Sequence, residues 1–162
     1  MKTTFLFAVA FVLSCTGVFS QAKWHISPAA GIAVINNNTR FSTALTVGRY
    51  IGNKNRYRVD LWGGYVPRKS ENIYSVAALF TLGEIPGIQD RWLTTSSLGI
   101  GLQKNEWLKN PDFIIPLKAN FGYKLTSNVA VGMDMSTNFN ITGWKEKTRM
   151  VYYTGLFVSF KF

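Results

Sequence analysis

The sequence ends in the stretch "MVYYTGLFVSFKF", Met150 to Phe162, in which large apolar residues alternate with small or polar ones. Read as a strand, it places on one face Tyr152, Leu156, Val158, Phe160 and Phe162. In a soluble sheet such a face would pack on a core. In a membrane barrel it can face lipid, provided that the sheet closes and leaves no unpaired edge. The stretch therefore raises the question of whether the rest of the chain can close a barrel.

Seven further segments share this period of two, and none has a convincing helical period. Each has roughly the ~9–11 residues of a tilted transmembrane strand. With the terminal stretch they make an even number of strands, as a bacterial membrane barrel requires. The predicted strands cover residues 23–35, 40–50, 56–66, 73–82, 91–103, 113–125, 129–141 and 150–162.

The connections between these segments carry turn residues, for example "NNNT" after the first segment and "IGNKN" after the second. Every connection is short enough to join antiparallel neighbours. The sequence therefore predicts an all-β fold, an eight-stranded antiparallel up-and-down transmembrane β-barrel.

The N-terminus, "MKTTFLFAVAFVLSCTGVFS", has the features of an export signal. Lys2 precedes an apolar run that is too short to span a bilayer as a helix, and small residues follow it. We expect residues 1–20 to be a cleaved signal peptide and residues 21–162 to form the barrel domain. Lipidation at Cys15 is the alternative processing. Cleavage after Ser20 would leave a chain without cysteine, so disulfides would not contribute to its stability.

The two faces of the segments differ in residue size. In the segment 129–141, bulky apolar side chains on one face oppose Gly132, Asp134, Ser136 and Asn138 on the other. The interior of an eight-stranded barrel has room only for its side chains, so small and polar residues belong there. This pattern favours apolar faces turned outward to lipid. The opposite orientation, in a secreted lipocalin-like carrier, stays open at this point.

The terminal stretch "GLFVSFKF" resembles the C-terminal signature of bacterial outer-membrane barrels. The whole chain after the signal is similar to small eight-stranded barrels of the OmpX and OmpA-transmembrane-domain type, including those of Bacteroidetes. The resemblance implies that the barrel-assembly machinery recognises the last strand through Tyr152, Leu156, Val158, Phe160 and Phe162. Thr154 departs from the pattern, because another large apolar residue is expected there.

Four charged residues fall on the inward faces, namely Arg58, Asp60, Lys118 and Asp134. Charges in so narrow a lumen must be paired or hydrated. We expect them to form a polar network that fills the barrel with side chains. A narrow channel for small solutes is the alternative, although eight-stranded barrels seldom leave an aqueous path.

Both termini of such a barrel should lie in the periplasm, which puts alternate loops outside the cell. Of the basic residues of these loops, we expect contacts with lipopolysaccharide phosphates from Arg68, Lys69, Lys145, Lys147 and Arg149. A solvated surface is the competing interpretation. The formal charge of +10 would permit nucleic-acid binding, but an exported barrel does not meet nucleic acid.

No catalytic or metal-binding pattern stands out. The single histidine, His25, lies at the periplasmic start of the first segment, the wrong end for chemistry on outer-leaflet lipid. No cysteine cluster or acidic ladder suggests a metal or cofactor. We therefore expect a non-enzymatic, envelope-structural outer-membrane protein whose partners are membrane lipid and, during biogenesis, the assembly machinery. An accessory or binding subunit of a larger outer-membrane complex is the alternative.

Overall fold

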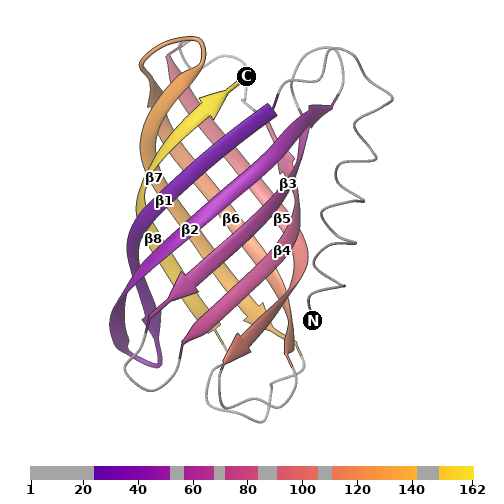
Figure 1. Ribbon diagram of the computed structural model, residues 1–162, viewed down its shortest axis with the longest axis vertical. Helices are drawn as coiled ribbons and strands as arrows, with labels where there is room; N and C mark the ends of the chain where they lie inside the picture. The colour runs from indigo at the N-terminus through magenta and orange to yellow at the C-terminus, as the bar shows by residue number, and fades with distance from the viewer. Residues whose placement is uncertain (1–23, 52–56, 68–71, 84–90, 106–110, 142–149) are drawn as a thin grey trace.

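The computed structural model describes residues 24–51, 57–67, 72–83, 91–105, 111–141 and 150–162 of the 162-residue chain. Over these residues, no helix is long and apolar enough to cross a membrane. The described chain forms a closed barrel of eight strands (Figure 1). The strands are β1 (Trp24–Ile35), β2 (Asn38–Ile51), β3 (Tyr57–Val66), β4 (Ile73–Leu82), β5 (Trp92–Asn105), β6 (Asp112–Lys124), β7 (Val129–Asn140) and β8 (Met150–Lys161).

The predicted all-β, eight-stranded antiparallel architecture is confirmed. Each predicted segment corresponds to one strand, with boundaries that differ by at most two residues. Consecutive strands pair in antiparallel order, and β8 pairs with β1 to close the sheet.

Closure extends to the last residue of the chain. The Trp24 amide donates to the Phe162 carbonyl at 3.1 Å, and the Phe162 amide donates to the Trp24 carbonyl at 2.9 Å. The start of β1 and the end of β8 therefore lie at the same end of the barrel, the upper end in Figure 1. We call this the terminal end, and the opposite end the loop end.

Two prolines coincide with interruptions of the ladder. The β1–β8 register has no pairs at Ser27 and Pro28, and the β5–β6 register has none at Ile115 and Pro116. Proline lacks an amide hydrogen and cannot donate to a neighbouring strand. On its other side each proline stays in register, opposite Leu45 and Asn138 respectively, so the barrel remains closed.

The tightest loop-end connection is a two-residue hairpin between β1 and β2. Its central residues, Asn36 and Asn37, have φ angles of 49° and 65°. Positive φ at both central residues is the signature of a type I′ turn, which matches the twist of antiparallel strands and favours asparagine. The "NNNT" motif therefore sets the register of the first hairpin.

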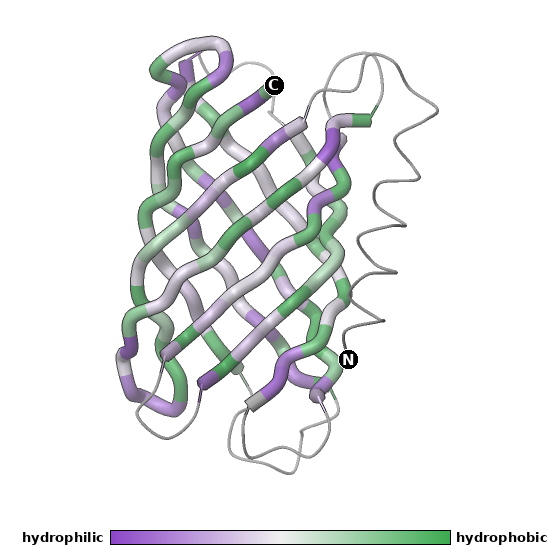
Figure 2. Tube along the Cα trace, in the orientation of Figure 1, coloured by the Kyte–Doolittle hydropathy of each residue, from purple (hydrophilic) through white to green (hydrophobic). Residues whose placement is uncertain are grey.

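The apolar faces of the strands point outward. Leu156 and Ile100 on the outer wall are 70% and 73% exposed, whereas Asp60 and Asn138 on the inner face are almost completely buried. The alternation of apolar and polar residues can be followed along single strands in Figure 2. The alternative with apolar faces turned inward, as in a lipocalin-like carrier, is therefore wrong.

Aromatic side chains gather toward both ends of the outer wall. At the terminal end Tyr57 stacks on Phe80, with ring centroids 5.8 Å apart. At the loop end Tyr65 lies beside Tyr74 at 5.1 Å. Two aromatic belts flanking an apolar band match the two interfaces of a bilayer.

Replacing Leu156 with arginine tests which medium surrounds this wall. A charge at mid-wall in lipid should lower the free energy of unfolding by about 2–4 kcal/mol. Urea titration in phospholipid vesicles would measure this free energy, with the heat-modifiable gel mobility as the readout of the folded fraction. Ser127→Arg, in the exposed turn between β6 and β7, is the control. Equal stability of the two variants would contradict a lipid-facing position for Leu156.

Candidate functional site in the barrel lumen

The four charged residues singled out from the sequence lie inside the barrel in two ion pairs. Arg58 Nε and Asp60 Oδ1 are 2.5 Å apart, on neighbouring inward positions of β3. Lys118 Nζ on β6 lies 2.9 Å from Asp134 Oδ2 on β7. All four side chains are buried. Pairing offsets the cost of removing these charges from water, and the buried charge sums to zero.

Asp60 has a second partner besides Arg58. Thr81 on β4 donates its hydroxyl to Asp60 Oδ2 at 2.6 Å, and the Thr81 and Ser97 hydroxyls are 2.8 Å apart. Arg58 also lies over the Tyr50 ring, 5.5 Å from its centroid. Both carboxylate oxygens of Asp60 therefore accept hydrogen bonds, which fixes the side chain against the wall.

Gly48 makes room for this carboxylate. It sits opposite Asp60 in the β2–β3 register, and a Cβ at this position would run into Asp60 Oδ1. Any larger residue would push the carboxylate away from Arg58 and Thr81. Gly48 thus belongs to the ion-pair site, although it carries no polar side chain.

Lys118 reaches across the lumen. Its Nζ donates to Thr46 Oγ1 on β2 at 2.9 Å, as well as to Asp134. Strands β2 and β6 are four strands apart in the closed ring of eight, so they face each other across the barrel. The second oxygen of Asp134 accepts from Asn120 at 3.1 Å in the amide orientation that satisfies both groups.

A second bridge crosses the lumen nearer the loop end. The hydroxyls of Tyr153 on β8 and Ser75 on β4 are 3.2 Å apart, and these strands are again opposite each other. The Asn138 amide donates to Ser75 Oγ at 3.3 Å and to Gln103 Oε1 at 3.2 Å. Polar side chains from β4, β5, β7 and β8 therefore meet in the middle of the barrel.

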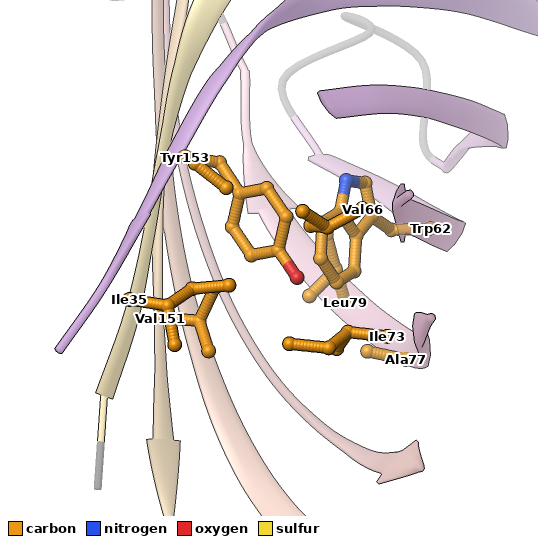
Figure 3. Close-up of a cluster of buried hydrophobic side chains, with 9 residues drawn as sticks. Ile35, Trp62, Val66, Ile73, Ala77, Leu79, Val151 and Tyr153 are labelled. Carbon is orange, nitrogen blue, oxygen red and sulfur yellow. The ribbon is translucent and has the colours of Figure 1, made fainter. Parts of the chain in front are cut away.

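Apolar side chains from β1, β3, β4 and β8 also line the lumen, beside the polar groups of the second bridge. The cluster shown in Figure 3 consists of Ala33, Ile35, Trp62, Val66, Ile73, Ala77, Leu79, Val151 and Tyr153. The Trp62 and Tyr153 rings meet edge to face, with centroids 5.5 Å apart. The expectation of a polar lumen therefore holds only for part of its lining. Strand β4 concealed the difference, because Ile73, Ala77 and Leu79 face inward while its outward face is apolar too.

His25 lies on the inner face near the terminal end of the barrel. It is 2% exposed, and its Nε2 is 2.8 Å from the hydroxyl of Ser159 on β8. Its Nδ1 has no partner among the described residues, so no carboxylate orients the ring as in a Ser–His–Asp arrangement.

The other predicted site residues divide into two groups. Tyr152, Leu156, Phe160 and Phe162 are exposed on the outer wall of β8, and Val158 is on the same face. The residues expected to contact lipopolysaccharide lie outside the described residues: Arg68, Lys69, Lys145, Lys147 and Arg149. The described part of the chain has no group of three or more His, Cys, Asp or Glu residues that could hold a metal ion.

Comparison with known proteins identifies the fold. No family model matches this sequence. No curated protein matches it either. Solved structures do match. Neisserial surface protein A (NspA) aligns with a TM-score of 0.59 and 16% identity, over 88% of this chain and 98% of that one. The N-terminal β-barrel domain of Pseudomonas aeruginosa OprF aligns with a TM-score of 0.60 and 15% identity, over 86% and 97%.

This chain has the fold of small outer-membrane β-barrels. The similarity extends to the outer membrane enzyme PagL, with a TM-score of 0.55, 15% identity and coverage of 84% of this chain and 98% of that one. Since an enzyme shares the fold, the fold by itself does not decide whether this barrel catalyses a reaction. Whether this barrel is an enzyme has to be judged from the side chains in its lumen.

A pair of glycine variants tests the ion-pair site. Gly48→Ala should displace the Asp60 carboxylate and lower the free energy of unfolding by about 1–3 kcal/mol, the usual cost of overpacking. Gly63→Ala is the matched control on β3, because its Cβ would meet only the Ser75 carbonyl oxygen at 3.9 Å. Urea titration in detergent micelles measures both. Equal stability would show that Gly48 does not position Asp60.

Proposed function

We propose that this protein is an integral outer-membrane barrel with a non-enzymatic, envelope-structural role and a lumen that does not conduct. The observation that carries the proposal is the obstruction of the lumen at two levels. Lys118 spans it to Thr46, and Tyr153 spans it to Ser75. Between and around these bridges the apolar cluster of Figure 3 fills further space in the lumen.

Water and ions have little room along this path. A cavity beside Asp134, Ser136 and Ser42 has a volume of about 10 Å³, roughly what one water molecule needs. These features support a filled barrel over the narrow-channel alternative. These features do not bear on the alternative of an accessory subunit. That role would show itself as a partner that co-purifies stoichiometrically in mild detergent.

The proposed orientation places both termini in the periplasm and the loop end outside the cell. In that orientation Arg68, Lys69, Lys145, Lys147 and Arg149 would meet lipopolysaccharide phosphates. The outward apolar wall and its aromatic belts support membrane insertion.

Planar-bilayer recording tests the sealed lumen. The wild-type barrel should insert without discrete conductance steps, because hydrogen-bonded side chains cross the path. A porin of ~16 strands in the same bilayer serves as the positive control. Discrete steps from the wild-type protein would contradict the proposal and favour a channel.

The terminal strand is proposed to act as the assembly signal. Phe162 is 67% exposed while its backbone is paired with Trp24. Phe162→Ala should therefore leave pairing intact but lower the yield of inserted protein in cells. Phe41→Ala removes a similarly exposed outward ring, 58% exposed, from β2 and should not lower the yield. Equal yields of the two variants would contradict a signalling role for Phe162.

A further inference from the structure

An exposed arginine is held at the terminal-end rim of the outer wall. Arg91 precedes β5, and its Nη1 donates to the Tyr123 hydroxyl on β6 at 3.0 Å. Its carbonyl accepts from the Lys124 amide at 2.7 Å. A backbone and a side-chain bond together restrict where the guanidinium can lie, although the residue is exposed.

Aromatic rings support this arginine from the membrane side. Trp92 meets Tyr123 edge to face at 5.5 Å and stacks on Phe121 at 5.0 Å with an interplanar angle of 21°. Trp92 and Tyr123 are direct partners in the β5–β6 register. The packed rings fix the position of the Tyr123 hydroxyl. This hydroxyl accepts the hydrogen bond from Arg91 and so positions the guanidinium.

Beyond the rings, toward mid-wall, the outward side chains become shorter. The outward pair that follows Thr94 and Phe121 is Ser96 with Ala119, and the next is Leu98 with Leu117. Ser96 and Ala119 are exposed short side chains between larger neighbours. From the rim toward mid-wall the surface therefore presents first a cation, then aromatic rings, then the two short side chains, and finally aliphatic side chains.

The charge of Arg91 is secure. The hydrogen bond to Tyr123 raises the pKa of Arg91 above its already high ordinary value, so the side chain is cationic at any physiological pH. Guanidinium carries five N–H donors in a planar fork, which suits the oxygens of a phosphate. Among the described residues, the one side-chain partner seen is Tyr123.

We propose that Arg91 and Tyr123 bind the phosphate of an anionic glycerophospholipid, whose chains lie over Trp92, Phe121 and the short side chains of Ser96 and Ala119. The site rests on the proposed function, since it needs a barrel inserted in a bilayer. In the proposed orientation the terminal end faces the inner leaflet, where glycerophospholipid is the available anion. Charge complementarity selects the headgroup, and the apolar wall receives the chains.

Native mass spectrometry of the full barrel in mild detergent, titrated with phosphatidylglycerol, tests the site. Wild type should retain one phosphatidylglycerol more tightly than phosphatidylcholine or lipid A. Arg91→Gln should weaken that binding about tenfold, as expected for the loss of a charge-assisted hydrogen bond. Tyr123→Phe should weaken it less, because the packed rings remain while the guanidinium loses its anchor.

Arg40→Gln is the matched control, because Arg40 is an exposed arginine near the loop end of β2. It should leave phosphatidylglycerol binding unchanged. Equal binding by wild type and Arg91→Gln, with both showing the heat shift of a folded barrel, would overturn the lipid site and leave the proposed function standing. Tighter binding of lipid A than of phosphatidylglycerol would overturn the assignment of the ligand as a glycerophospholipid. Failure of the wild type to insert into vesicles would contradict the function and the site together.

Discussion

Closure of the sheet is the constraint on which the rest of the molecule depends. In hydrocarbon no water can satisfy an open strand edge, so β1 and β8 must pair along their length. They do so, apart from the interruption at Ser27 and Pro28, up to the mutual backbone bonds of Trp24 and Phe162. Once the ring is closed, one face of every strand is outside and the other inside. The period of two in the sequence then fixes both the lipid-facing wall and the contents of the lumen.

A ring of eight strands leaves an interior that must be filled. The chain fills it with side chains of two kinds: polar ones that bridge opposite walls and apolar ones that pack toward the loop end. A buried charge in such a space is tolerated only with a partner, and Arg58 and Lys118 each have a carboxylate in reach. Removing Lys118 alone would leave Asp134 uncompensated. The bridges therefore bind opposite walls together, and in the proposed function the same contacts also seal the lumen.

The sequence predicted every strand, because alternation is a local signal that tertiary context did not override. It also named four charges, Arg58, Asp60, Lys118 and Asp134, whose side chains the structure buries in the lumen. It could not predict the partners across the lumen, since the meeting of Lys118 with Thr46 depends on the stagger of the whole ring. Gly48 was missed for a similar reason: its role appears only when the β2–β3 register sets it against Asp60. On strand β4 the inward face mixes Ile73, Ala77 and Leu79 with Ser75 and Thr81 while the outward face is apolar too, so the apolar cluster could not be inferred from alternation.

In the proposed topology the chain spans the outer membrane with its terminal end in the periplasm. Single cysteines at Thr39, exposed at the loop end, and at Ser127, exposed at the terminal end, test it directly. Cys15 is the chain's one cysteine, and it lies in the predicted signal. A membrane-impermeant maleimide on intact cells of a Gram-negative host should label Thr39→Cys, and it should label Ser127→Cys only after the outer membrane is permeabilised. Labelling of both in intact cells, or the reverse pattern, would contradict the account.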